Sequence, residues 1–258
     1  MHFLNPIRLS ACAAAVLTCA PAVAVTLVLE LPASRDATIY ANATGFANGA
    51  GASFLAGTNG SGQARRALLG FDLGSVSPGA TVLSASLSLY ADQVPNATAR
   101  SISLRALQQQ WTEGPTDAGA QQGQGVAAAN GDVTWASAQH PSTPWTTPGG
   151  TFGASSATTI VAGVGLYTWS STDAGNDGMR ADVQRWLDDP STNFGWALVG
   201  VETGTSTVKR FVSSEGDAGL VPLLRLEIAP VPEPSTWALL AVGLVATLRA
   251  GCSRIRPS

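Results

Sequence analysis

Cysteine is absent from the central part of the sequence. All three cysteines lie near the ends of the chain, at Cys12, Cys19 and Cys252, so residues 25–230 contain none. This excludes a disulfide framework, a thiolate zinc site and a cysteine nucleophile there. Histidine is nearly as scarce, with His140 alone in this stretch, and the Gly-x-Ser-x-Gly motif of a serine hydrolase is missing from it. We therefore interpret His140 as an ordinary loop residue.

Charge is scarce as well. Charged residues make up 12% of the chain, where an average soluble domain has about 25%, and Lys209 is the one lysine. Residues 25–230 carry ten basic and sixteen acidic side chains. A nucleic-acid binder needs a basic surface that displaces phosphate counterions, so we expect no nucleic-acid partner. The composition also argues against a helical bundle and, with abundant Gly, Ser and Thr, favours an exported β protein.

The N-terminus has the pattern of a signal peptide over residues 1–24. Arg8 precedes an apolar run from Ala11 to Ala20, and small residues then lead to Ala24. We predict cleavage after Ala24. A lipoprotein signal is the weaker alternative, because leucine and threonine stand where small residues should precede Cys19.

The C-terminus combines three features. A Pro-Glu-Pro motif occupies residues 231–235, an apolar segment follows at 236–252, and a basic tail with three arginines covers 249–258. The apolar segment has the minimum length for a helix that crosses about 30 Å of hydrocarbon, and the arginines would keep the tail in the cytoplasm. We therefore predict a transmembrane helix over 236–252. The central residues of the motif are Pro232, Glu233 and Pro234.

Together these C-terminal features resemble the PEP-CTERM sorting signal. Proteins with this signal are exported by bacteria that make exopolysaccharide, and a membrane protease of the exosortase type is held to process them near the motif. The resemblance implies an exosortase-type protease as a partner and transient anchoring in the inner membrane. It also implies a final location in the cell envelope, on the outer surface or in the extracellular matrix.

Residues 25–230 have the pattern of a single all-β domain. Apolar and polar residues alternate in several short segments, which is typical of strands with one buried and one wet face. Gly- and Pro-rich turns separate them, and the combination predicts a β-sandwich. The predicted strands lie at 68–73, 83–89, 101–106, 196–200, 224–228 and, more briefly, 208–212.

One segment has a helical period instead. Apolar residues recur at i, i+4, i+7 and i+8 from Met179, so we predict a short amphipathic helix over 178–187, lying against the sheet. Asp177 is placed to cap its N-terminus. Residues 112–165 show no sustained period, and we interpret them as long surface loops with one strand near 157–161.

Short motifs follow one another in a fixed order along the central domain. They lie at 66–73, 78–90, 111–114, 133–135, 145–152, 182–187, 193–198 and 211–215. Together these motifs resemble the DNRLRE domain. This family, also described as disaggregatase-related, is similar to a carbohydrate-binding module family with members that bind alginate. The resemblance covers residues 34–228 and implies a jelly-roll-like antiparallel β-sandwich without chemistry of its own, used as an accessory or surface module.

Tryptophans in the middle of the domain are the first ligand-binding candidates. An indole offers a flat apolar face on which a sugar ring stacks, while nearby polar groups bind its hydroxyls. We assign this role to Trp111, Trp135 and Trp145, with packing that pins the long loops as the alternative. Trp186 and Trp196 lie on the predicted helix and a predicted strand, so we expect both in the core.

Arginines are the second group of candidates. A guanidinium binds a carboxylate through two parallel hydrogen bonds, so Arg105, Arg65 and Arg66 are suited to an acidic polysaccharide. We place Arg105 in the predicted site. Arg66 precedes a core strand, and for this residue bonding within the fold is the alternative.

No cofactor is required by this interpretation, although calcium remains an alternative because extracellular sandwiches can bind it through oxygen ligands. The candidate ligands lie before the predicted helix, where an N-cap and a solvated loop are the plainer explanation. They are Asp173, Asn176 and Asp177.

Three functions remain from the sequence. The first is a non-catalytic surface or matrix protein that binds or organises exopolysaccharide, and the second is a purely structural surface protein. The third is an enzyme: a glycosidase, whose candidate carboxylates are Glu113, Asp117 and Asp132, or a polysaccharide lyase. We favour the first and expect no enzymatic activity.

Overall fold

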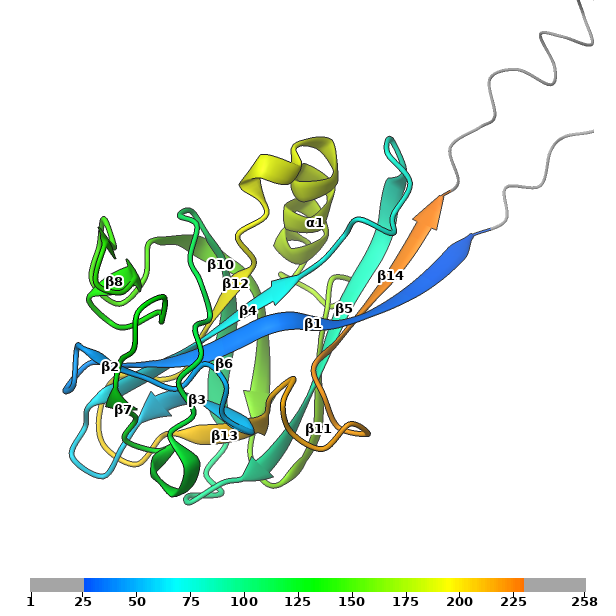
Figure 1. Ribbon diagram of the computed structural model, residues 1–258. Helices are drawn as coiled ribbons and strands as arrows, with labels where there is room; N and C mark the ends of the chain where they lie inside the picture. The colour runs from blue at the N-terminus through cyan, green and yellow to red at the C-terminus, as the bar shows by residue number, and fades with distance from the viewer. Residues whose placement is uncertain (1–25, 230–258) are drawn as a thin grey trace, which may run out of the picture.

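The structure, a computed structural model, describes residues 26–229 as an antiparallel β-sandwich closed by one helix (Figure 1). The main strands are β1 (Leu27–Tyr40), β3 (Ser53–Thr58), β4 (Ala64–Phe71), β5 (Thr81–Gln93), β6 (Arg100–Leu107), β10 (Phe152–Val161), β11 (Gly165–Ser170), β12 (Trp196–Val199), β13 (Lys209–Val212) and β14 (Leu223–Ala229). The smaller elements are β2 (Phe46–Ala47), β7 (Val126–Ala127), β8 (Ser137–Gln139), β9 (Thr143–Pro144), the helix α1 (Gly178–Asp188) and the 3-10 turns η1 (Gly119–Gln121) and η2 (Pro190–Thr192).

The main strands form two layers. Sheet A contains β14, β5, β13 and β11, and sheet B contains β4, β12, β6 and β10. The layers join because β3 pairs with β13 in one and β4 in the other. The predicted all-β sandwich is therefore confirmed.

Strand β1 belongs to both layers. Leu27 to Pro32 pair with β14 in sheet A, whereas Ala33 to Tyr40 pair with β4 in sheet B. The register shifts between Ala33 and Arg35, and such an irregularity lets a strand bend from one sheet into another. The first strand thus closes one side of the sandwich.

The predicted strands are all present, and the helix is confirmed at Gly178–Asp188. Trp186 and Trp196 are buried, as expected, with ring centroids 4.5 Å apart. The strand expected near 157–161 is longer and begins at Phe152.

Asp177 stands at the N-cap position of α1, as predicted, but its side chain does not cap the helix. Asp177 has helical backbone angles (φ −60°, ψ −20°), whereas a capping residue adopts an extended conformation that lets its side chain reach the first free amides. Its carboxylate accepts no capping hydrogen bond and instead pairs with Arg180 at 2.8 Å.

The long connection between β6 and β10 builds a second hydrophobic cluster outside sheet B. Residues 108–151 fold over that face, with only small strands and one 3-10 turn of their own. This cluster is separate from the main core between the sheets. Its buried members are Ala37, Ile39, Leu68, Leu107, Trp111, Val133, Ala138, Trp145 and Ala197.

Within residues 26–229, no helix is both long and apolar enough to cross a membrane. The predicted signal peptide 1–24 with its cleavage site at Ala24, the sorting motif 231–235 and the apolar segment 236–252 lie outside the described residues.

Candidate functional site

Trp111 and Trp145 are buried inside the second hydrophobic cluster. Their side chains are 1% and 4% exposed. Each indole N–H already donates a hydrogen bond to a backbone carbonyl, from Trp111 to Phe194 at 2.8 Å and from Trp145 to Thr134 at 2.9 Å. Neither ring therefore has a free face on which a sugar could stack, and both pin the 108–151 connection to sheet B.

Trp135 is placed differently, because it is half-buried at the margin of this cluster. The guanidinium of Arg66 lies over its ring, 4.6 Å from the centroid, and donates to the carbonyl of Gly149 at 2.8 Å. The amide of Gly149 in turn donates to the carbonyl of Trp135 at 2.7 Å. Gly149 has φ +88°, and a β-carbon there would lie 2.6 Å from both Arg66 and Trp135, so only glycine fits between them.

Arg66 also contacts Phe152, which in turn contacts Arg105. The guanidinium of Arg66 lies 5.1 Å from the centroid of the Phe152 ring, and that of Arg105 lies 5.8 Å from it. Phe152 is on β10 and Arg105 on the neighbouring strand β6. We call Trp135, Arg66, Phe152 and Arg105 the aromatic–arginine row. Trp135, Phe152 and Arg105 are all partly exposed, so the row reaches the surface with guanidinium groups stacked on its two rings.

The two arginines of the row have different partners. Arg66 is paired within the fold, because its Nε and Nη2 donate to both carboxylate oxygens of Glu202 at 2.6 and 2.8 Å. Arg105 makes only long contacts, to Ser103 at 3.3 Å and to the carbonyl of Gly153 at 3.5 Å. Within the described chain it forms no ion pair with a carboxylate, so it can bind an external acceptor.

Arg65 is a structural residue. It is 1% exposed, lies over the Tyr40 ring at 5.5 Å, and donates to the carbonyl of Gly123 and to Asn42. These bonds tie β4 to the connection after η1 and to the turn after β1, so Arg65 is not available to a polysaccharide.

A cavity of about 610 Å³ lies beside the row. Gly153 and Ser155 of β10 form one wall, where the register of β10 against β6 is irregular and Ser155 pairs with Arg105 of β6. Arg185 of α1 also lines the cavity and pairs with Asp182 at 3.0 Å. None of the four residues of the row lines it, so the cavity adjoins the row without being part of it.

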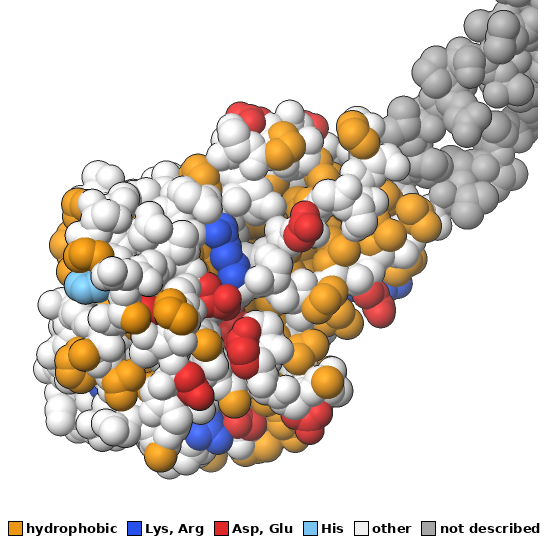
Figure 2. All heavy atoms as spheres, in the orientation of Figure 1, with side chains coloured by type: hydrophobic (Ala, Val, Ile, Leu, Met, Phe, Trp, Pro, Cys, Tyr) orange, Lys and Arg blue, Asp and Glu red, His pale blue; other side chains and the backbone are white. Residues whose placement is uncertain are grey.

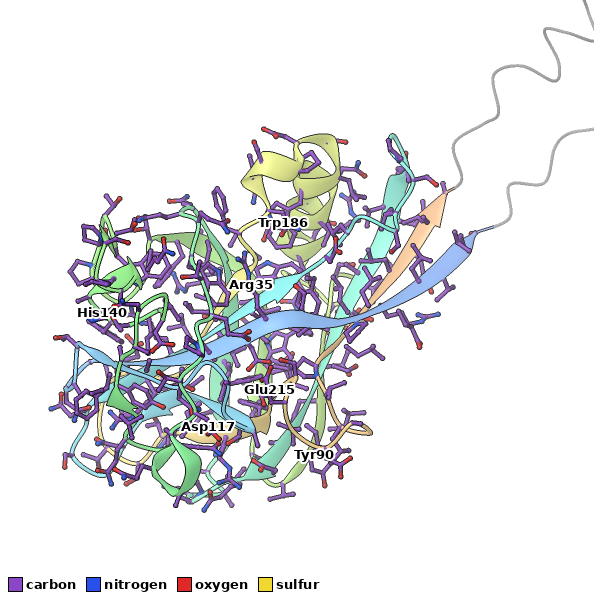
Figure 3. All side chains as sticks on the ribbon, viewed as in Figure 1. Arg35, Tyr90, Asp117, His140, Trp186 and Glu215 are labelled. Atoms are coloured by element: carbon purple, nitrogen blue, oxygen red, sulfur yellow. The ribbon has the colours of Figure 1, made fainter. Side chains whose placement is uncertain are left out.

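Three carboxylates meet on the side of sheet B where β1 crosses between the layers. One oxygen from each of Asp36, Glu113 and Glu215 lies within 4.8 Å of the other two. Arg35 adjoins them, donating to the carbonyl of Trp111 at 2.7 Å with its guanidinium 4.5 Å from that ring. Figure 2 shows basic and acidic side chains adjoining in the middle of this face, where Figure 3 labels Arg35 and Glu215.

Burial strongly perturbs two of these acids. Burial raises the pKa of Asp36 to about 8, although hydrogen bonds from the amide and hydroxyl of Ser214 oppose the rise. Burial likewise raises the pKa of Glu113 to about 7, against a hydrogen bond from the amide of Asp36 at 2.5 Å. The neighbouring carboxylate of Glu215 raises both values further.

This acidic cluster has the donor set that a hard divalent cation takes in proteins, and it can equally share protons among its carboxylates. It differs from the set considered from sequence, of which it contains Glu113 alone. Asp117 is exposed and binds the amide of Gly119, while Asp132 is fully buried and organises the loop through Thr116 and Ala129.

Of the three calcium ligands considered from sequence, one has a clear structural role. Asn176 is buried, and its amide side chain bonds both the N–H and the carbonyl of Thr158, which fixes the loop before α1 to β10. Asp177 pairs with Arg180, while Asp173 is exposed.

Two family models match the chain. Residues 28–117 match carbohydrate-binding module family 96, and residues 230–254 match the PEP-CTERM protein-sorting motif. These matches confirm the resemblance to a carbohydrate-binding module and to the sorting signal, which marks exported proteins sorted to the cell surface. Arg66 and Arg105 lie inside the first match, whereas Trp135 and Phe152 lie beyond it. A search of curated proteins finds no match.

Proposed function

We propose that this chain is an exported, non-catalytic surface protein whose sandwich binds polysaccharide through the aromatic–arginine row. The observation that carries the proposal is Arg105, a partly exposed guanidinium without an ion pair in the described chain, beside the partly exposed rings of the row. The match to a carbohydrate-binding module supports the same assignment.

The row suits a polymer whose sugars carry carboxylates. Sugar rings present C–H faces that pack on Trp135 and Phe152, while a uronate carboxylate can accept two hydrogen bonds from Arg105. Exopolysaccharides with uronate units are therefore the ligand class that we propose. Binding of this kind needs no cofactor.

We further propose that residues 236–252 hold the chain in the inner membrane until an exosortase-type protease processes it near 231–235. The sorting-motif match and the apolar sequence of this segment support the proposal. The processed protein would then lie in the cell envelope or the extracellular matrix.

A purely structural surface protein is the second candidate. The burial of Trp111 and Trp145 favours it, because two of the three tryptophans considered as platforms pack loops instead. An enzyme has less support: the raised pKa of Glu113 suits a general acid, but its neighbour Asp36 is 1% exposed and faces Ser214.

The test is affinity electrophoresis of the purified chain, in mild detergent, through gels that contain alginate, another uronate polymer or a neutral glucan. We expect a uronate polymer to retard the protein, equally with EDTA and with calcium. Arg105→Ala and Trp135→Ala should each weaken retardation about tenfold, a loss typical of one charge-assisted contact or stacked ring.

Arg225→Ala is the control, since Arg225 is an exposed arginine on sheet A, paired with Glu227 and far from the row in the fold. It should leave retardation unchanged, and circular dichroism should show all variants folded. Absence of retardation in every gel would instead support the structural candidate, and a fall in polymer viscosity would establish an enzyme.

A further inference from the structure

Exposed large aliphatic side chains gather at two ends of strand β5. Leu27, Val28 and Leu83 are 49%, 43% and 47% exposed, and they form what we call the apolar tip. A second group lies at the turn between β10 and β11: Ile160, Val164 and Leu166, which are 58%, 60% and 66% exposed. Single exposed aliphatic residues are common, but two compact groups need an explanation.

Strand register places the members of the apolar tip at the same end of sheet A, with Leu27 and Val28 on opposite faces of β1. Leu27 of β1 pairs with Ile228 of β14, and Ile228 pairs with Val82, the neighbour of Leu83 on β5. The other group lies at the far end of β5, because Leu166 pairs with Tyr90. Eight residues of strand separate Val82 from Tyr90, which corresponds to about 26 Å.

The apolar tip is also where the described chain ends. Figure 1 shows the start of β1, the start of β5 and the end of β14 together at the end of the molecule from which the grey traces leave, and Figure 2 shows hydrophobic side chains at the same end. Strand β14 ends at Ala229, and the apolar sequence begins at Thr236. Seven residues reach at most about 25 Å, so the tip cannot lie far from the start of that segment.

We propose that the apolar tip contacts the surface of the lipid bilayer in which residues 236–252 are anchored. This inference rests on the anchor that we assign to the chain under its proposed function. Charged side chains adjoin the tip: Glu227 lies opposite Val28 in the register and pairs with Arg225 at 3.0 Å, and Glu30 is exposed two residues beyond Val28. The contact that we propose is therefore with the headgroup surface of the bilayer, where charged side chains stay hydrated.

Three aliphatic side chains bind a bilayer weakly by themselves. Tethering changes this, because an anchor a few residues away keeps the tip at a high effective concentration near the membrane. The contact would orient the domain with β5 pointing away from the membrane and with the turn between β10 and β11 as the outermost point. It would end when the chain is released from its anchor.

The experiment uses the full chain in vesicles of phosphatidylethanolamine and phosphatidylglycerol, with benzoyl-phenylalanine at one position. Position 83 tests the tip, position 166 is the more exposed control at the other end of β5, and position 242 tests the anchor. After illumination, lipid adducts are counted by mass spectrometry. We expect strong adducts at 242 and at least tenfold more at 83 than at 166.

Each outcome bears on the proposal. Adducts at 242 without any at 83 overturn the tip contact and leave the anchor intact, whereas equal adducts at 83 and 166 show unspecific contact and also overturn it. No adducts at 242 would refute the anchor and, with it, this inference. As a second measurement, Leu27→Glu should lower the adducts at 83 at least fivefold, and Val164→Glu should not change them.

Discussion

The outer faces of the two sheets are built from different residues. On sheet B, the 108–151 connection covers the strands, and tryptophans, arginines and an acidic cluster lie beneath it or at its margin. On sheet A, β5 presents Ser84, Ser86 and Ser88 to the outside, all partly exposed. Ser88 forms its hydrogen bond at 3.2 Å to Thr168 of the neighbouring strand.

The difference shows how a sandwich acquires a site. A sheet face that no loop covers, which we call a bare face, needs only small hydroxyl side chains, which form hydrogen bonds with one another across neighbouring strands. A sheet face covered by a long loop must bury large rings, and every charge beneath the loop must be paired or neutralised by a proton. On sheet B this loop is the 108–151 connection, which we call the cover. Rings and arginines are half-exposed at the margin of the cover, and there we place the binding surface.

The largest expected effect comes from removing a ring under the cover. Trp111→Ala should destabilise the protein by about 3–5 kcal/mol, the range for truncating a buried tryptophan, because it leaves a cavity and unpairs the carbonyl of Phe194. Urea unfolding measures it. A loss below about 1 kcal/mol would show that the cover contributes little to the fold.

The second effect is a dependence of stability on pH. With a native pKa of about 8, Asp36 keeps its proton where the unfolded chain has lost it, so its contribution is full below about pH 4 and is lost as pH rises to 8. Stability should fall by about 2–3 kcal/mol from pH 5 to pH 7. Thermal melts should show a flatter profile for Asp36→Asn, while the exposed control Asp117→Asn keeps the slope.

A smaller effect is expected at the margin of the cover. Gly149→Ala places a β-carbon against Arg66 and Trp135 at a positive φ, so it should cost about 1–3 kcal/mol and weaken polysaccharide retardation. Gly60→Ala is the control, because a β-carbon there meets nothing within 4 Å. Equal unfolding midpoints for the two variants would show that the row tolerates displacement.

The smallest effect belongs to the bare face. Ser86→Ala should change stability by no more than about 0.5 kcal/mol, because its neighbours on the open face remain solvated. Urea unfolding of this variant beside Trp111→Ala measures the contrast between the faces directly. A loss comparable to that of Trp111→Ala would remove the distinction.

The same contrast explains which strands the sequence could predict. Strand β5 alternates because one face is buried and the other is wet, and its pattern was readable from 83–89. Strand β3 is buried at every position, so it has no alternation to detect. Strand β1 was missed because its pattern is interrupted by Pro32 and by the change of sheet near Ala33.

The candidate site was predictable only in part. The sequence predicts Trp135 and Arg105 from residue type, and the fold places both in the aromatic–arginine row, whose role in binding stays a prediction. Burial of Trp111 and Trp145 could not be read from the sequence, because it depends on how a 44-residue connection without periodicity folds back onto sheet B. The acidic cluster joins Asp36 of β1 to residues 77 and 179 positions further on, and both of these lie in loops whose path over β1 the sequence does not reveal.

The position of β14 determines how the domain responds to mechanical load. The strand is the last of the described chain and lies between β1 and β5, antiparallel to both. A pull on Ala229 along the strand axis, as from a tethered C-terminus, loads both ladders of hydrogen bonds in shear. All rungs then resist together and cannot open one after another from an end. If the domain binds a polymer on sheet B while its C-terminus is held at the membrane, tension between the two would load β14 along its axis. That is the direction in which its hydrogen bonds to β1 and β5 resist best.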